Sequence, residues 1–286
     1  MVLALVLALG ACRPARTSRL VVGSKNFTES LILGELLAQQ LESKLGVLVE
    51  RRFYLAGTYI CQQAILAGRI DAYVEYTGTA LTSILKERPG GSAEAVYRQV
   101  KEGYARRFGL VVGPPLGFDN SFALVVRQED ADRLHLKTIS DAAAYAPHWR
   151  AGFGYEFIER PDGYQGLAKT YSLHFASPPR IMDLGLLYRA LVNREVDIVA
   201  GNSTDGLIAA LHLVALKDDR HYFPPYQAVP IVREQTLARY PEMKVALGQL
   251  AGKISAEDMR KMNYAVDGER LDPATVVRKF LRSKGL

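Results

Sequence analysis

Residues 68–79 read Gly68-Arg69-Ile70-Asp71-Ala72-Tyr73-Val74-Glu75-Tyr76-Thr77-Gly78-Thr79. The apolar residues near the start of this stretch predict a short buried strand, and the polar loop after it leads into a helix near Thr77. A second stretch follows the same order from its own strand-opening Asp: Arg194-Glu195-Val196-Asp197-Ile198-Val199-Ala200-Gly201-Asn202-Ser203-Thr204-Asp205. We interpret this echo as two related halves of the chain, each offering one strand and one polar loop.

The surrounding sequence extends the pattern of strands and helices. We predict strands over 20–22, 47–54, 70–75, 121–127, 151–154 and 197–200, and helices over 58–67, 141–146, 164–171, 181–193 and 204–213. The first helix is predicted to begin with a capping box formed by Asn26 and Glu29. This alternation predicts an α/β fold with largely parallel sheets. Ligands bind beyond the carboxyl ends of such strands, so the loops 24–28 and 76–79 are expected on one functional edge.

Composition narrows the classes of function. The chain has 286 residues, of which 49% are hydrophobic and 23% are charged, so it is globular and long enough for two compact lobes. Its net charge of +6 comes from scattered Lys and Arg residues, which disfavours nucleic-acid binding. The histidines are dispersed and nucleophile motifs are missing, so we expect no catalytic residues, no metal and no cofactor. Asp71 and Asp197 are predicted to cap a helix or a loop and not to act as paired catalytic carboxylates.

The N-terminus predicts export. Residues 1–11 are apolar or Gly, and polar residues follow Cys12. Such a run is too short to cross a bilayer as a helix, and it is typical of a secretory signal. Leu9-Gly10-Ala11-Cys12 resembles the bacterial lipobox, which implies lipidation of Cys12 and makes residues 1–18 a signal peptide, lipobox and tether. No Lys or Arg precedes the apolar run. The second cysteine, Cys61, is predicted to be a small buried apolar residue.

Several motifs resemble those of one family. They are Gly23-Ser24-Lys25-Asn26-Phe27-Thr28-Glu29, Glu75-Tyr76-Thr77-Gly78-Thr79, Arg160-Pro161-Asp162-Gly163-Tyr164, Ser203-Thr204-Asp205-Gly206 and Phe223-Pro224-Pro225-Tyr226. From Val22 to about Leu286 the chain resembles the binding proteins of osmoprotectant ABC importers, which take glycine betaine, carnitine, choline and related compounds. The resemblance implies a type II periplasmic-binding-protein fold.

The family's organisation predicts how the chain is divided. Residues 19–121 and 228–286 would form lobe I, and residues 122–227 lobe II, with crossings near 120–122 and 226–229. The protein is then expected to be an extracytoplasmic, lipid-anchored monomer. Its partners would be a small ligand and a membrane permease with its ATPase. Hinge closure around the ligand is expected.

The resemblance also places site residues. A trimethylammonium group has no hydrogen-bond donor and is held by aromatic faces. Tyr76 and Tyr226 match cage tyrosines, Phe122 stands where a tyrosine is usual, and Asn120 matches a polar floor position. Asn202 stands where glycine betaine binders place a further tyrosine. A ligand carboxylate would be held at the positions matched by Lys25, Thr79 and Arg160.

The Asn202 departure leaves the ligand open. The main hypothesis is a quaternary ammonium compound such as glycine betaine, choline or carnitine. One alternative keeps the fold but binds a bulkier betaine such as ergothioneine, or another polar solute. A second alternative is a ligand-sensing receptor module that signals without delivering its ligand to a permease.

Overall fold

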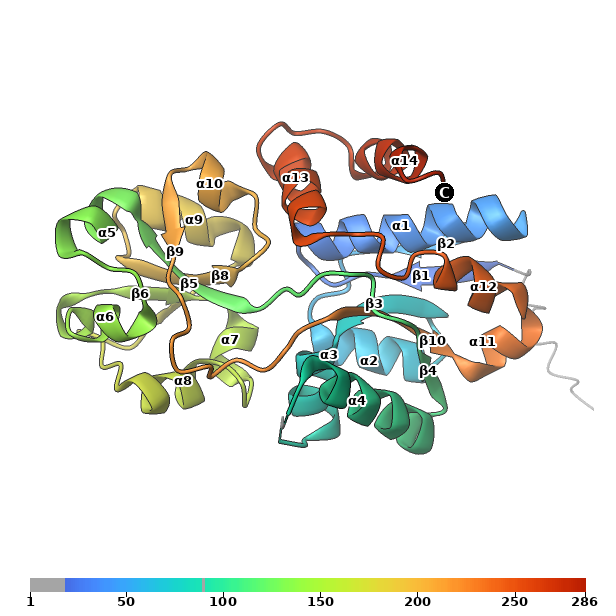
Figure 1. The fold of residues 1–286 in the computed structure, drawn as a ribbon, viewed down its shortest axis with the longest axis horizontal. Helices are drawn as coiled ribbons and strands as arrows, with labels where there is room; N and C mark the ends of the chain where they lie inside the picture. The colour runs from blue at the N-terminus through green and yellow to red at the C-terminus, as the bar shows by residue number, and fades with distance from the viewer. Residues whose placement is uncertain (1–18, 89–90) are drawn as a thin grey trace, which may run out of the picture.

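The computed structural model describes residues 19–88 and 91–286. The chain forms two lobes, each built on a five-stranded sheet flanked by helices (Figure 1). In lobe I the strands are β1 (Leu20–Gly23), β2 (Val49–Arg52), β3 (Ala72–Tyr76), β4 (Leu110–Val112) and β10 (Ala228–Arg233), in the order β2-β1-β3-β10-β4. The predicted α/β fold is confirmed. Cys12 and the predicted signal segment lie outside the described residues.

Lobe II repeats the topology of lobe I. Its strands are β5 (Phe122–Arg127), β6 (Ala151–Phe153), β7 (Arg180–Ile181), β8 (Ile198–Asn202) and β9 (Leu213–Ala215), in the order β7-β6-β8-β5-β9. In each sheet four strands run in one direction and one strand, β10 or β5, runs against its two neighbours. Each reversed strand is the first strand that the chain forms after it crosses between the lobes.

The echo found in the sequence corresponds to one structural device used in both lobes. The N–H of Asp71 donates to the carbonyl of Val21 (2.7 Å), and the N–H of Val21 donates to the Asp71 carboxylate (2.9 Å). Asp197 and Arg150 form the same reciprocal pair at 2.7 and 2.9 Å. Each Asp therefore ties the start of β3 or β8 to the neighbouring strand, and neither residue caps a helix.

Helices cover both faces of each sheet. Lobe I carries α1 (Thr28–Leu45), α2 (Thr58–Leu66), α3 (Thr77–Thr79), a π-helical segment (Ala80–Leu85), α4 (Ala93–Phe108), α11 (Glu234–Arg239), α12 (Glu242–Gly248), α13 (Ala256–Asp267) and α14 (Pro273–Ser283). Lobe II carries α5 (Gln128–Leu134), α6 (Ile139–Ala143), a 3-10 turn (Ala146–His148), α7 (Tyr155–Glu159), α8 (Tyr164–Tyr171), α9 (Leu184–Val192) and α10 (Leu207–Ala210). The core helix α1 buries Ile32, Leu36 and Leu41 and packs on α12, α13 and α14.

Two local predictions were wrong. The helix α1 begins at Thr28 and Phe27 caps it without a side-chain hydrogen bond, so Asn26 and Glu29 form no capping box. Glu29 points instead into a buried polar cluster described below. The helix predicted over 204–213 is only the four residues of α10 (Leu207–Ala210). It is short because the chain then turns into β9, which pairs with β5 at the sheet edge. Pairing partners distant in sequence decided that boundary.

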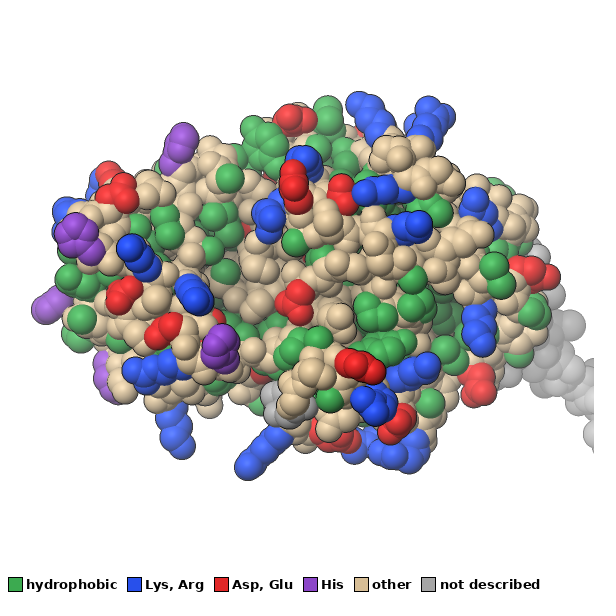
Figure 2. All heavy atoms as spheres, in the orientation of Figure 1, with side chains coloured by type: hydrophobic (Ala, Val, Ile, Leu, Met, Phe, Trp, Pro, Cys, Tyr) green, Lys and Arg blue, Asp and Glu red, His purple; other side chains and the backbone are tan. Residues whose placement is uncertain are grey.

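Two segments, 113–121 and 216–227, carry the chain between the lobes, and they lie side by side (Figure 1). Asp119 and Gln227 form an antiparallel bridge, and the N–H of Asn120 donates to the Tyr226 carbonyl (3.1 Å). The two crossing segments are thus hydrogen-bonded to each other, at residues 119–120 of the first and 226–227 of the second. On the face shown in Figure 2, Lys and Arg side chains are interspersed with Asp and Glu. No helix within residues 19–88 and 91–286 is long and apolar enough to span a membrane.

Candidate functional site

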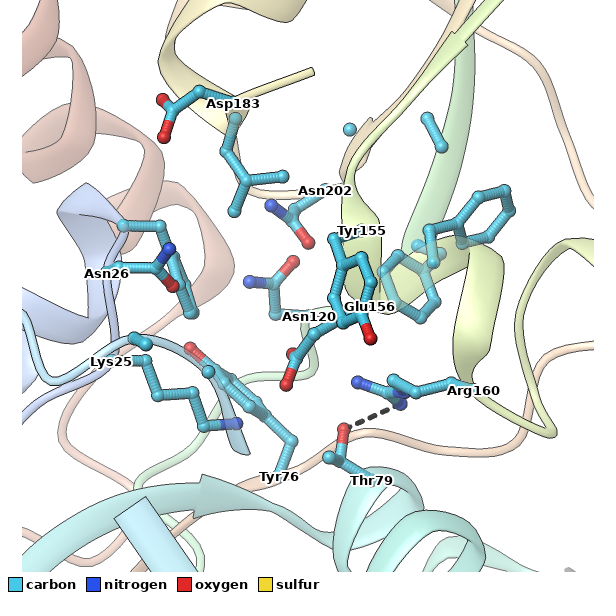
Figure 3. Close-up of a pocket in the computed structure, with 18 of the residues that line it drawn as sticks. Lys25, Asn26, Tyr76, Thr79, Asn120, Tyr155, Glu156, Arg160, Asp183 and Asn202 are labelled. Atoms are coloured by element: carbon cyan, nitrogen blue, oxygen red, sulfur yellow. Dashed lines mark hydrogen bonds between the residues drawn. The ribbon is translucent and has the colours of Figure 1, made fainter. Parts of the chain in front are cut away.

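A cavity of about 500 Å³ lies between the lobes, beside the two crossings. We call it the interlobe cavity. Its volume falls within the usual range of small-molecule sites. All eight residues named from the sequence line it: Lys25, Tyr76, Thr79, Asn120, Phe122, Arg160, Asn202 and Tyr226. Figure 3 shows the polar side chains converging on this space from both lobes. Carboxyl ends of strands and the crossings bring these distant segments together.

Three aromatic rings form one part of the wall. Tyr76 ends β3, Phe122 begins β5, and Tyr226 lies just before β10. The Phe122 and Tyr226 rings are 6.1 Å apart and nearly perpendicular. Tyr76 and Tyr226 are almost fully buried, with exposed fractions of 5% and 2%. The rings are therefore held by packing and present fixed faces.

Arg160 lies against two of these rings. Its guanidinium carbon is 4.8 Å from the Phe122 centroid and 5.9 Å from that of Tyr226. It pairs with Asp162 at 2.5 Å, and it donates across the cleft to the Thr79 hydroxyl (2.9 Å). The Tyr226 hydroxyl also donates to Asp162, at 2.5 Å. Burial opposes ionisation of Asp162, but the Arg160 charge and these hydrogen bonds outweigh it and lower its pKa.

Lys25 has a similar arrangement in lobe I. Its ammonium forms a buried ion pair with Glu75 and lies 5.1 Å from the centroid of the Tyr76 ring. Glu75 also accepts the N–H of Tyr76 (2.8 Å), so one carboxylate fixes both the lysine and the ring. Both cations named from the sequence as anion-binding positions thus already have a carboxylate partner within their own lobe. Neither partner was identified from the sequence.

Glu29 connects both lobes beneath the rings. Its carboxylate accepts hydrogen bonds from Tyr76 (2.6 Å), Asn120 (2.8 Å) and Asn263 (3.0 Å), and from Thr204 of lobe II (2.5 Å). Burial raises the pKa of Glu29 above its ordinary value, although these four donors act to lower it. Glu29 thereby holds Tyr76 and Asn120 in place from behind the cavity wall.

Further contacts hold the lobes closed. The N–H of Thr58, in the first turn of α2, donates to Glu156 of lobe II at 2.7 Å. On the other rim Gly206, at the start of α10, lies against the backbone of Tyr264 in α13. Together with the pairs Arg160–Thr79 and Thr204–Glu29, these contacts close the cavity from several sides.

Asn202 and Asp205 form a turn at the lobe II side of the cavity. Asp205 accepts the N–H of Asn202 (2.8 Å) and the hydroxyl of Tyr188 (2.5 Å). Asp205 is half-buried, and its carboxylate points toward these two donors. Burial raises the pKa of Asp205 from 3.8 to about 6, and the hydrogen bonds from Tyr188 and Asn202 only partly oppose this rise.

The raised pKa of Asp205 predicts a pH effect on stability. Between about pH 4 and pH 6 the folded protein keeps a proton that the unfolded chain releases, so the free energy of unfolding falls as pH rises. This contribution is present below about pH 4 and is lost by about pH 6, and it amounts to roughly 3 kcal/mol. In Asp205→Asn the amide oxygen can accept the same hydrogen bonds but does not titrate. Between about pH 4 and pH 6 the melting temperature of the wild type should therefore fall relative to that of Asp205→Asn. A difference in melting temperature that stays constant with pH would contradict the raised pKa.

The carboxylates Glu29, Glu75, Glu156 and Asp162 are the lining or supporting residues that the sequence did not reveal. Glu29, Glu75 and Asp162 lie inside the motifs 23–29, 75–79 and 160–164, and membership of these motifs could have indicated them. Across the described part of the chain, no group of three or more His, Cys, Asp or Glu side chains is placed to hold a metal ion.

Two matching lobes, two crossings and a polar-aromatic cavity between them define a two-lobed solute-binding protein of the type II periplasmic class. Residues 18–283 match the family model described as the substrate binding domain of an ABC-type glycine betaine transport system. The chain belongs to this family.

Named relatives and solved structures agree with this membership. The carnitine transport binding protein OpuCC of Listeria monocytogenes is 36% identical over 265 residues, covering 91% of this chain and 85% of that protein. The ergothioneine transport permease/ergothioneine binding protein EgtU of Helicobacter pylori is 35% identical over 268 residues, covering 93% of this chain and 48% of that protein. A crystal structure titled as a glycine betaine/carnitine/choline ABC transporter superposes with a TM-score of 0.77 at 33% identity, covering 93% of this chain and 98% of that one.

Proposed function

We propose that this protein is the extracytoplasmic solute-binding component of an ABC importer, and that it captures a quaternary ammonium compound and delivers it to a membrane permease with its ATPase. The observation that carries the proposal is the set of rings Tyr76, Phe122 and Tyr226 in one cavity. The buried carboxylates of Glu29, Glu75 and Asp162 accept hydrogen bonds from Tyr76 and Tyr226. Such rings attract a cation that cannot donate hydrogen bonds, and each desolvated contact contributes about 2 kcal/mol. Glu29 accepts the hydroxyl of Tyr76 and holds that ring in place.

The other lining residues have roles within this proposal. Asn120 and Asn202 offer amide groups to polar atoms of the ligand, and Thr79 and Arg160 face a carboxylate where the ligand has one. Because Arg160 and Lys25 are paired with Asp162 and Glu75, a ligand carboxylate gains less from them than from free cations. The pairing of both cations therefore gives a ligand with a carboxylate no large advantage over a ligand without one. Choline, carnitine and glycine betaine all belong to the proposed ligand class.

Binding and transport are linked by closure in this proposal. The ligand stabilises the closed form only by its differential affinity for the closed and open states. Lobe I would comprise 19–121 and 228–286, and lobe II 122–227. The protein would act as a monomer whose lobes move relative to each other about the two crossings. Lipidation at Cys12 would hold the protein near its permease and raise the encounter rate.

A bulkier betaine is the second candidate ligand. Asn202 removes one aromatic wall, and Ile181, Met182 and Leu184 add an apolar surface to the cavity. The relative named as an ergothioneine binding protein supports including that compound among the candidates.

Isothermal titration against glycine betaine, choline, carnitine and ergothioneine tests the proposal. We expect at least one compound to bind, and Tyr76→Ala to weaken it by about 30-fold through loss of a cation–π contact. Tyr76→Phe, which keeps the ring and loses only the hydrogen bond to Glu29, should lose much less. The ligand class is wrong if none of these compounds binds or raises the melting temperature.

A further inference from the structure

The lobe II side of the interlobe cavity lacks an aromatic ring at the end of β8. Ala200, Gly201 and Asn202 line the cavity there, and none has a ring. A larger side chain cannot replace Gly201, because an added Cβ would lie 1.9 Å from the Tyr188 hydroxyl. A cation held against Tyr76, Phe122 and Tyr226 would therefore face small or polar groups on this side.

Tyr155 lines the same cavity but differs from the other aromatic residues. Its exposed fraction is 64%, compared with 59% for Tyr54 and 39% for Tyr264. Among residues 19–88 and 91–286 its side chain has no hydrogen-bond partner and its ring contacts no other aromatic ring. In Figure 3 its ring lies in the view between Asn202 and Arg160. The Tyr155 ring can therefore move to meet a ligand, whereas the rings of Tyr76 and Tyr226 are fixed by packing.

The residues that follow Tyr155 are firmly placed. Phe157 is buried in the lobe II core, 4.8 Å from the Phe122 ring. Glu156 accepts the Thr58 N–H from lobe I, and Arg160 donates to Thr79 of lobe I. Tyr155 therefore begins a helical turn that contacts lobe I on closure. Opening of the lobes would break the hydrogen bonds of Glu156 to Thr58 and of Arg160 to Thr79, and it would withdraw the Tyr155 ring from Tyr76 of lobe I.

We propose that Tyr155 supplies the aromatic wall that Asn202 does not, and that it meets the ligand's cationic group when the lobes close. This inference rests on the proposed function, because it assumes a quaternary ammonium ligand. An exposed ring that becomes desolvated against such a cation gains the larger part of the cation–π attraction only in the closed complex. Tyr155 thus favours the closed state in the presence of ligand.

Titration of a compound that the wild type binds tests the inference. Tyr155→Phe keeps the ring and should bind within about twofold of the wild type, whereas Tyr155→Leu, which is apolar but has no ring, should bind about tenfold more weakly. Tyr54→Ala is the matched control, because Tyr54 is also exposed (59%) but does not line the cavity. It should leave the affinity unchanged.

A second variant asks whether Tyr155 and position 202 serve the same part of the ligand. Adding Asn202→Tyr to Tyr155→Leu should recover most of the lost affinity. Equal affinities for Tyr155→Leu and the wild type would overturn the inference and leave the proposed function standing, as would a double variant that recovers nothing. If the wild type binds no quaternary ammonium compound, the proposed function and this inference fail together.

Discussion

Replacing Arg160 by Met is expected to lower the free energy of unfolding by about 3 kcal/mol and to weaken ligand binding by at least about 100-fold. The stability loss arises because Asp162 would remain buried without its partner. The affinity loss has a different origin. Arg160 donates to Thr79 across the cleft and lies against the Phe122 ring, so its removal affects both closure and the cavity wall.

A double variant separates these two effects. In Arg160→Met with Asp162→Asn, the amide oxygen still accepts the Tyr226 hydroxyl but no unpaired charge stays buried. Urea unfolding should show that most of the stability returns, while calorimetry should show that the affinity does not. If the double variant also regained tight binding, Arg160 would act only by balancing Asp162, and its place among the ligand-binding residues would be wrong.

Gly206→Ala is expected to weaken binding by about 30-fold or more while changing the ligand-free melting temperature little. An added Cβ at Gly206 would lie 2.5 Å from the N of Tyr264 and 2.7 Å from its Cα, and backbone atoms cannot give way easily. Figure 1 shows α10 and α13 facing each other from the two lobes. Because the contact exists only between lobes, the open form would relieve the clash without unfolding either lobe.

Small-angle X-ray scattering with saturating ligand measures closure directly. Wild-type protein should become more compact, and Gly206→Ala should stay extended at the same ligand concentration. The control is Gly248→Ala, since an added Cβ at Gly248 meets nothing within 4 Å. Normal compaction and affinity in Gly206→Ala would show that α13 moves aside, and that the contact with α10 does not limit closure.

The fold could be predicted from the sequence because local patterns repeat in it. The strand-opening residues Asp71 and Asp197 each tie one strand to its neighbour, so a short motif carried information about a whole lobe. Element ends were less predictable. The strand β9 was missed because only its pairing with β5 stabilises it, and that partner lies almost ninety residues earlier in the chain, between residues 122 and 127.

The cavity residues were predictable for the same reason, since they follow strand ends that share one edge. Their charge partners were not. Lys25 and Glu75 are separated by fifty positions, and only the tertiary fold brings them into an ion pair. Glu29 was interpreted as a helix cap because capping boxes are local patterns, whereas its four donors come from segments as distant as Thr204 and Asn263.

The reversed strand β10 also sets an order of assembly. All strands of lobe II lie between residues 122 and 215, so that sheet can be completed as soon as this stretch of chain exists. The lobe I sheet cannot, because β10 lies between β3 and β4 and is made only when the ribosome reaches Arg233. The N-terminal half of the chain must therefore wait, with the edges of β3 and β4 unpaired, until the second lobe has been synthesised. During that interval an exposed strand edge is open to pairing with other chains.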